Sequence, residues 1–187
     1  VYPGDYPFTL TSEITPFHDV AITSVKPNTR RVYAGPPQSY VNITVEAKND
    51  GTETETFNVT AYYNSTQIGT QTINDLEPDQ TKVLNFIWNT TEITPCTCYQ
   101  LRAEADTVPG ETQILNNIFV DGWVWITILG DIDCDGDVDP DDFYLFAGAY
   151  GTSIGQPSYN VYCDLDGDGD VDPDDFYLFA GNYGKTC

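Results

Sequence analysis

Two runs of aspartates, offset by 33 residues, hold the residues best placed to do chemistry in this chain. Residues 135–148 recur letter for letter at 168–181, so the two runs form an internal repeat. In each copy, acidic residues fill alternate positions of a twelve-residue loop, and a glycine fills the sixth, where the chain must turn sharply. Alternate residues of a tight loop direct their oxygens at one centre, so each copy predicts a site for a hard divalent cation.

The predicted ligands are the aspartates at positions 1, 3, 5, 7, 9 and 12 of each loop, where position 7 offers its backbone carbonyl and position 9 often binds through a water. They are Asp131, Asp133, Asp135, Asp137, Asp139 and Asp142 in the first copy, and Asp164, Asp166, Asp168, Asp170, Asp172 and Asp175 in the second. Calcium is favoured over magnesium, because magnesium retains waters and avoids sites built wholly of protein oxygens. Two calcium ions are therefore predicted. The alternative is a solvated acidic tail, which two full matches in tandem make a poor explanation.

A short helix is predicted directly after each loop. Asp139 and Pro140 are typical of a helix cap and its first position, and acidic residues follow in the first turn. Apolar residues then recur at i, i+3, i+4 and i+7, and a glycine ends the pattern: Phe143, Phe146, Ala147, Tyr150 and Gly151, with Phe176, Phe179, Ala180, Tyr183 and Gly184 in the second copy. No helix is expected before either loop, because residues 123–129 have the pattern of a strand and residues 156–162 that of coil.

A duplicated calcium loop with only an exiting helix resembles a type I dockerin. The resemblance covers residues 130–184, within a predicted module of residues 130–187. It implies that the two halves pack as a pseudo-symmetric pair and that the module plugs into a partner, such as a cohesin-like domain. Dockerins that bind cohesins typically carry small hydroxyl residues near the helix start, whereas this chain has Pro140-Asp141 and Pro173-Asp174 there.

The composition is that of a folded, acidic, exported protein. The net charge of −22 over 187 residues argues against nucleic acid and anionic membranes as partners, and 40% hydrophobic residues argue against disorder. No apolar run is long enough for a membrane span. The chain contains no methionine, even at its first position, so we expect removal of a signal peptide and an extracellular or cell-surface location.

Ahead of the acidic module, residues 18–129 follow an all-β pattern. Apolar and polar residues alternate most clearly over residues 40–48 and 57–63, and further strands are expected near 20–25, 67–73, 81–88, 98–105 and 114–129. About seven short strands separated by turns predict an immunoglobulin-like β-sandwich. Trp123 and Trp125 alternate with Val124 and Ile126, so this strand is expected to be buried on both faces. The fold class is therefore mainly β, with a small α module.

This part of the chain also resembles the CARDB family of cell-adhesion-related domains in bacterial and archaeal surface proteins. The likeness rests on His18-Asp-Val-Ala-Ile22, Val45-Glu-Ala-Lys-Asn-Asp-Gly51, Leu76-Glu-Pro-Asp-Gln80 ahead of a strand ending in Trp88, and Ala105-Asp106 with Glu111 and Asn116-Asn117. The resemblance carries no catalytic expectation.

Residues 1–17 precede the predicted sandwich and form an arm with alternating apolar residues around Phe8 and Leu10. One interpretation is an extra edge strand on the chain's own sheet. The other is a strand donated to a neighbouring molecule by β-augmentation.

Five cysteines and four glycosylation motifs fit an exported protein. The cysteine spacings miss the zinc templates, and the disulfide predicted is Cys134 to Cys187, with other pairings left open. Asn-x-Ser/Thr motifs occur at Asn42, Asn58, Asn64 and Asn89, so N-linked glycans are expected. The alternative for these motifs is a set of polar strand faces rich in asparagine and threonine.

No arrangement of nucleophile, base and orienting group is present, and the single histidine, His18, lies at a strand entry. The sequence thus predicts a non-catalytic structural protein that assembles with copies of itself, head to tail, into an extracellular filament or sheath. The alternatives are a scaffold adaptor that docks a cohesin-like receptor and a carbohydrate-binding module.

Overall fold

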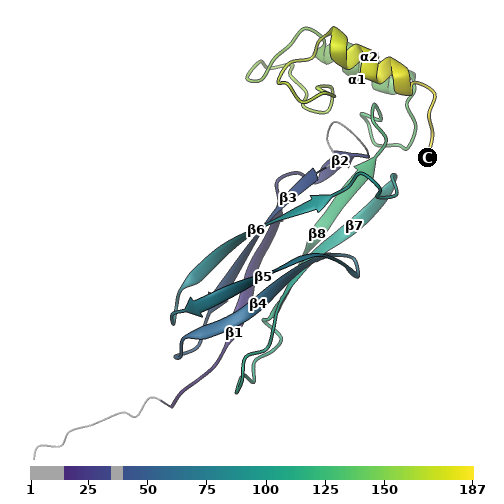
Figure 1. The fold of residues 1–187 in the computed structure, drawn as a ribbon. Coiled ribbons are helices and arrows are strands. Elements are labelled where there is room, and N and C mark those ends of the chain that lie inside the picture. The colour runs from purple at the N-terminus through teal and green to yellow at the C-terminus, as the bar shows by residue number, and fades with distance from the viewer. Residues whose placement is uncertain (1–14, 35–39) are drawn as a thin grey trace, which may run out of the picture.

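Alternation of apolar and polar residues along each strand builds a sandwich of two sheets (Figure 1). The computed structural model describes residues 15–34 and 40–187, so residues 1–14 of the predicted arm lie outside the described part. One sheet has the strand order β1-β3-β6 and the other β2-β8-β7-β4-β5. The strands are β1 Val20–Pro27, β2 Arg31–Tyr33, β3 Tyr40–Asn49, β4 Glu55–Tyr63, β5 Thr66–Leu76, β6 Thr81–Asn89, β7 Thr97–Ala105 and β8 Ile118–Thr127. The prediction of a mainly β fold is confirmed.

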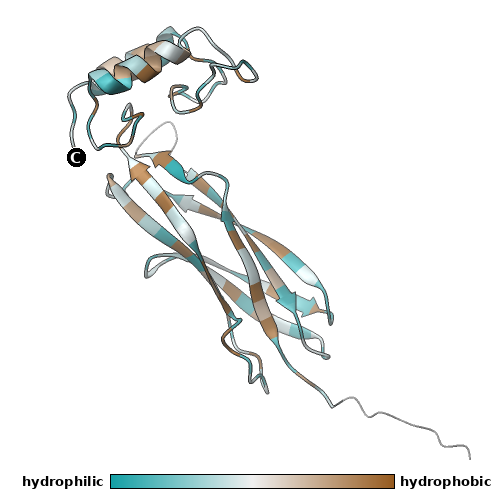
Figure 2. Ribbon diagram, turned by 180° about the vertical axis from the view of Figure 1, so that it is seen from behind, coloured by the Kyte–Doolittle hydropathy of each residue, from teal (hydrophilic) through white to brown (hydrophobic). Residues whose placement is uncertain are grey.

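The core lies between the sheets, where the inward residues of each strand meet. On β3, Val41, Ile43, Val45 and Ala47 are buried, and the residues between them face outward. Apolar and polar residues alternate in the same way along other strands (Figure 2). This period of two fixes the register, because a slip of one residue would turn the buried row toward water.

The strand predictions hold along most of the sandwich and fail at β2 and β8. The short strand β2 was not predicted; it pairs in parallel with the end of β8. Residues 114–117 form a turn ahead of β8. The prediction that β8 is buried on both faces is wrong at Trp123, which is 55% exposed. Strand β8 lies between β2 and β7, but its outer face is not covered there by another layer.

Two helices, α1 Pro140–Ala149 and α2 Pro173–Asn182, lie beyond one end of the sandwich (Figure 1). Both begin as predicted, with an aspartate cap, a proline and acidic residues in the first turn, and the structure adds a reciprocal capping box at each start. The two halves pack as a pseudo-symmetric pair. Phe146 stacks on its repeat counterpart Phe179 at 5.4 Å between ring centroids. Two isolated bridges, Asp137 with Thr186 and Ser153 with Asp170, are also repeat counterparts, because Asp137 and Ser153 lie 33 positions before Asp170 and Thr186.

The disulfide prediction of Cys134 with Cys187 is wrong, because Cys187 pairs with Cys96 at a Cα–Cα distance of 6.0 Å. The C-terminus does return to the first loop, as expected, since the backbone N–H of Cys187 donates to the carbonyl of Gly136 at 2.9 Å. Cys96, however, lies just before β7 at the end of the sandwich next to the module, and it forms the disulfide with Cys187 there. Within the described part of the chain, Cys98, Cys134 and Cys163 remain free thiols.

Candidate metal centre

The first acidic loop brings five of its six predicted ligands into two overlapping groups. Asp131, Asp133 and Asp142 place carboxylate oxygens within 4.8 Å of one another, and so do Asp137, Asp139 and Asp142. Asp142 belongs to both groups, so its carboxylate lies between the two halves of the loop. Within residues 15–34 and 40–187, Asp135 joins neither group; its Oδ1 instead accepts the N–H of Asp137 at 3.1 Å.

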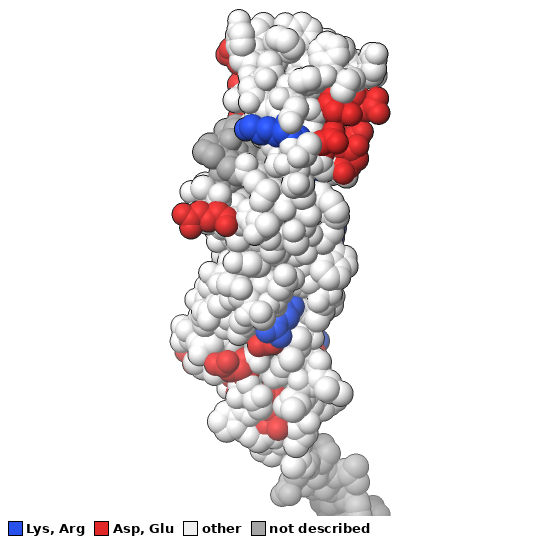
Figure 3. Space-filling view, turned by 90° about the vertical axis from the view of Figure 1, so that its right-hand side faces the viewer, with Lys and Arg blue, Asp and Glu red and all other residues white. Residues whose placement is uncertain are grey.

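The second loop gathers all six predicted ligands. Asp164, Asp166 and Asp168 form one group within 4.8 Å. Asp170, Asp172 and Asp175 form the other. Seen from one side, acidic side chains gather in a patch at the module end of the molecule (Figure 3).

The last aspartate of each loop organises the backbone around the predicted ion. Asp142 Oδ1 accepts the N–H groups of Ile132 at 2.5 Å and Asp133 at 3.0 Å, and its Oδ2 accepts that of Asp139 at 2.9 Å. Asp175 makes the same three contacts in the second loop, at 2.6, 3.1 and 2.8 Å. The sharp turn at the sixth position is also repeated, with φ of 103° at Gly136 and 106° at Gly169. These conformations suit glycine, because left-handed backbone is costly for other residues.

The carboxylates are close enough to disfavour one another's charge. Burial raises the pKa of Asp133 above its ordinary value, and the carboxylates of Asp142 and Asp135 raise it further. Burial likewise raises the pKa of Asp166, and the charges of Asp175 and Asp168 add to the effect. A bound cation would lower the pKa values of these carboxyl groups, because an opposite charge at close range favours the ionised form.

Three carboxylate oxygens in the loops are buried and accept no hydrogen bond from the described residues. They are Oδ1 of Asp131, Asp137 and Asp170. Leaving a buried charged oxygen without a partner costs several kcal/mol, on the order of 2–7 for a polar group and more for a charge. The donor set consists of carboxylate oxygens, which are the ligands of hard cations and poor ligands for soft metals. The residues present therefore fit calcium, which would neutralise these oxygens and fix the loop shape.

The sandwich is bonded directly to the first loop. Arg31 of β2 donates to the backbone carbonyls of Asp131 and Ile132, the latter at 2.6 Å, and its guanidinium lies 4.4 Å from the ring centroid of Tyr162. Thr127, the last residue of β8, donates its hydroxyl to Asp131 Oδ2. The first predicted metal ligand is thus held by residues from two strands of the sandwich.

Tyr33 of β2 forms a second connection, this time to the segment that enters loop two. Its hydroxyl donates to the carbonyl of Tyr162 at 2.6 Å, and its ring lies buried in the module's core with Phe146 and Phe179. Burial raises the pKa of the Tyr33 hydroxyl well above its usual range. The tyrosine therefore stays protonated and keeps its role as a donor. The roles of Arg31 and Tyr33 were not predictable from the sequence, because a three-residue strand leaves no periodic signal.

The four glycosylation motifs lie on the sandwich. Asn42, Asn64 and Asn89 are exposed. Asn58 is half-buried and uses both ends of its amide, donating to Asp106 Oδ2 at 2.9 Å and accepting from Thr72 at 2.7 Å. Glycosylation at all four stays a prediction, with Asn58 the least accessible.

The sandwich is similar to a known protein family. A model of the CARDB family matches residues 19–121, which is more than half of the 187 residues. The chain belongs to the CARDB family. The CARDB match ends before the first acidic loop, so it covers the sandwich and not the module. No curated protein sequence matches this chain.

The chain is similar to solved structures that include a CARDB domain. The CARDB domain of the PF1109 protein from Pyrococcus furiosus, in complex with di-metal ions, is 25% identical, with a TM-score of 0.49 over 60% of this chain and 96% of that one. A solution structure of the same domain gives 24% identity and a TM-score of 0.50 over 61% and 99%. Residues 272–376 of a presumed cell surface protein from Methanosarcina acetivorans are 22% identical, with a TM-score of 0.46 over 59% and 92%. Within the described residues of this CARDB chain, neither helix is long and apolar enough to cross a membrane.

Proposed function

We propose that this CARDB chain is a non-catalytic structural protein of the cell exterior whose dockerin-like module binds two calcium ions, and that copies assemble head to tail into a filament or sheath. The observation that carries the proposal is the pair of loops in which carboxylate oxygens converge, three of them, Oδ1 of Asp131, Asp137 and Asp170, buried without a hydrogen-bond donor among the described residues. Such an arrangement is costly in the absence of a cation and favourable with one.

The proposed role of calcium is to make the module a rigid extension of the sandwich. Asp142 and Asp175 bind the loop backbone and also cap the helices through the capping boxes. Asp131 connects the first loop to β8 through Thr127. An ion held by these carboxylates would therefore fix the loop, the helix start and the end of the sandwich together.

Head-to-tail assembly is supported by the placement of the two ends. The described chain begins at the end of the sandwich that is remote from the helices (Figure 1), so residues 1–14 join the sandwich at the end opposite to the module. A contact between opposite ends of two copies is heterologous and does not close, which produces a fibre. An extracellular setting supplies calcium in abundance, and sugars on the exposed sequons would fit the same setting.

Electron microscopy and sedimentation velocity of the full chain test this function. With millimolar calcium we expect filaments or concentration-dependent oligomers, and we expect EDTA to shorten or dissolve them. Particles that remain monomeric at every protein concentration, with and without calcium, would contradict the proposed assembly. Binding to a cohesin domain by such monomers would instead favour an adaptor.

A further inference from the structure

The helix pair exposes more of its aromatic surface than its pattern predicts. Phe146 and Phe179 are buried in the module core, as expected of residues on the apolar face. Phe143 and Phe176, predicted on the same face, are 42% and 41% exposed, and Tyr150 and Tyr183 are also exposed. The aromatic face is thus only half used by the fold, which leaves an apolar surface for another binding partner.

This surface contains two neighbouring grooves related by the internal repeat. One has a volume of about 340 Å³ and is lined by Phe143, Phe146, Ala147, Tyr150 and Phe176. The other, of about 410 Å³, is lined by Phe143, Phe176, Phe179, Ala180 and Tyr183. Phe143 and Phe176 contribute to both grooves and form the wall between them.

We propose that these twin aromatic grooves receive the N-terminal segment, residues 1–14, of a second copy of the chain. The proposal deepens the function proposed above and rests on it for the head-to-tail geometry. The segment contains two Tyr-Pro dipeptides, Tyr2-Pro3 and Tyr6-Pro7, followed by Phe8 and Leu10. A repeated aromatic-proline pair matches a repeated apolar groove, and proline-containing segments bind aromatic-lined grooves with a low cost in chain entropy.

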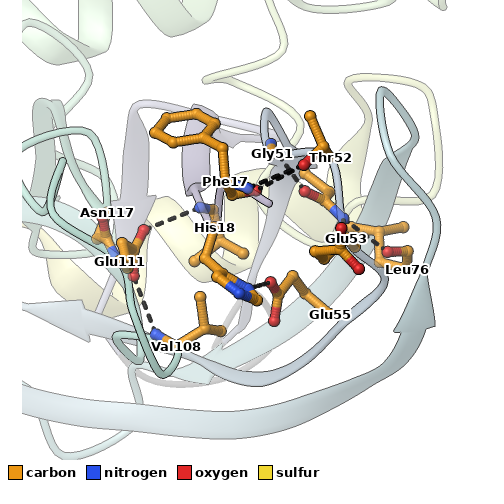
Figure 4. Close-up of polar contacts among 12 residues, drawn as sticks. Phe17, His18, Gly51, Thr52, Glu53, Glu55, Leu76, Val108, Glu111 and Asn117 are labelled. Carbon is orange, nitrogen blue, oxygen red and sulfur yellow. Dashed lines mark hydrogen bonds and ion pairs between the residues drawn. The ribbon is translucent and has the colours of Figure 1, made fainter. Parts of the chain in front are cut away.

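The point at which this segment leaves the sandwich is well fixed (Figure 4). The backbone N–H of Phe17 donates to Thr52 Oγ1 at 2.9 Å, and its carbonyl accepts the N–H of Thr52 at 2.7 Å. His18 Nδ1 lies 2.5 Å from Glu55 Oε1, and the N–H of Val20 donates to Glu111 at 2.9 Å. These contacts hold the chain at the end of the sandwich remote from the module.

Chain length favours the grooves of a second copy over the chain's own. Fourteen residues reach at most about 50 Å when fully extended. Returning along the sandwich takes about 33 Å, the length of the ten residues of β3. About five residues would remain, which is too few to seat both Tyr-Pro dipeptides, which span residues 2–7, in grooves that lie beyond the sandwich end. In a second copy, the whole segment is available for binding.

The grooves are also coupled to the proposed calcium loops. Phe143 directly follows Asp142, and Phe176 directly follows Asp175. Because these two aspartates hold both the loop backbone and the helix start, loss of calcium should disorder the groove walls. Binding of the segment should therefore require calcium.

Fluorescence polarisation with a labelled peptide of residues 1–14 tests the proposal against the full chain in calcium, at chain concentrations below those at which copies assemble, so that the grooves are free. We expect saturable binding to the wild type and at least tenfold weaker binding to Phe143→Ser/Phe176→Ser. The matched control is Tyr144→Ser/Tyr177→Ser, which removes two rings on the same helices, 72% and 71% exposed, outside the grooves. The control should bind within about twofold of the wild type. A second variant, Ala147→Gln/Ala180→Gln, fills the grooves at exposed helix positions and should also weaken binding. Near-UV circular dichroism in calcium establishes that each variant is folded.

The possible outcomes distinguish binding of the N-terminal segment in the grooves from assembly of the chain into filaments. Absence of binding to the wild type, or equal binding by both folded groove variants, would overturn the groove assignment even if filaments form. Binding without filaments would support the grooves and contradict the filament. A monomeric chain that binds peptide only after Tyr2→Ser/Tyr6→Ser would show that the segment occupies its own grooves, which overturns the assignment to a second copy.

Discussion

At the scale of single residues, the closing aspartate of each loop has two roles. Asp142 and Asp175 lie fully buried, accept three backbone N–H groups each, and belong to the ligand groups. One carboxylate therefore shapes the loop and contributes an oxygen to the predicted ion.

Substitution of either closing aspartate should remove one calcium site and spare the other. We expect Asp142→Asn or Asp175→Asn to weaken calcium at its own loop by about 10–100-fold or more, because even partners that only orient ligands have effects of that size. Isothermal titration calorimetry would show a stoichiometry near one. The control is Asp141→Asn, an exposed acid one residue away that should leave both sites intact. Two unaltered sites in Asp142→Asn would contradict the assignment.

The set of acidic ligands was predictable from the spacing, but the way in which the carboxylates divide into two groups in each loop was not. Eleven of the twelve predicted aspartates join a carboxylate group, including Asp137 and Asp170, for which the template predicts a backbone carbonyl and not a side-chain oxygen. Among the described residues Asp135 does not, although its counterpart Asp168 accepts the same backbone hydrogen bond and does join a group. The disulfide was wrong for a different reason. The prediction names Cys134 because it lies in the same module as Cys187. Only the fold shows that Cys96 of the sandwich lies next to Cys187.

At the scale of secondary-structure elements, long periodic strands were predictable and short ones were not. The inward residues of β3 and β4 alternate over nine or ten residues, which gives a clear period of two. Strand β2 has three residues, too few for any period, yet two of them, Arg31 and Tyr33, contact the module. The helix starts were predictable from their caps. The partial exposure of the apolar helix face was not, because the pattern marks apolar residues without showing what covers them.

The contact between β2 and the first loop should be energetically substantial. Arg31→Ala removes two charge-assisted hydrogen bonds and a cation–π contact, so we expect a loss of about 2–4 kcal/mol from the free energy of unfolding in calcium. Chemical denaturation would measure it. The control is Arg30→Ala, which removes an exposed ion pair with Asp121 and should cost no more than about 1 kcal/mol. Equal losses for the two variants would contradict a special role for Arg31.

At the scale of the whole molecule, the chain is closed back on itself by the link between Cys96 and Cys187. The link spans 91 residues and joins the start of β7 to the C-terminus. Because a crosslink limits the unfolded chain, Cys187→Ser should lower the free energy of unfolding by about 2–5 kcal/mol. Cys134→Ser, a free and half-buried thiol, provides the control and should have a smaller effect. Mass spectrometry of the unreduced protein should find the Cys96–Cys187 peptide pair; a Cys134–Cys187 pair would contradict the structure.

Rigidity of the module is the property on which the proposed head-to-tail contact depends. The sandwich has its own large core, whereas the module's core is small and its loops repel themselves electrostatically. Removal of calcium should therefore disorder the module and leave the sandwich folded.

Hydrogen exchange with and without calcium, combined with calorimetric titration, tests most directly whether calcium keeps the module rigid. We predict that two ions bind per chain, and that stripping them raises exchange throughout residues 130–187 while the strands β3, β4 and β7 stay protected. A chain that binds no calcium at millimolar concentration, or a module whose protection is unchanged after removal of every divalent ion, would contradict the account.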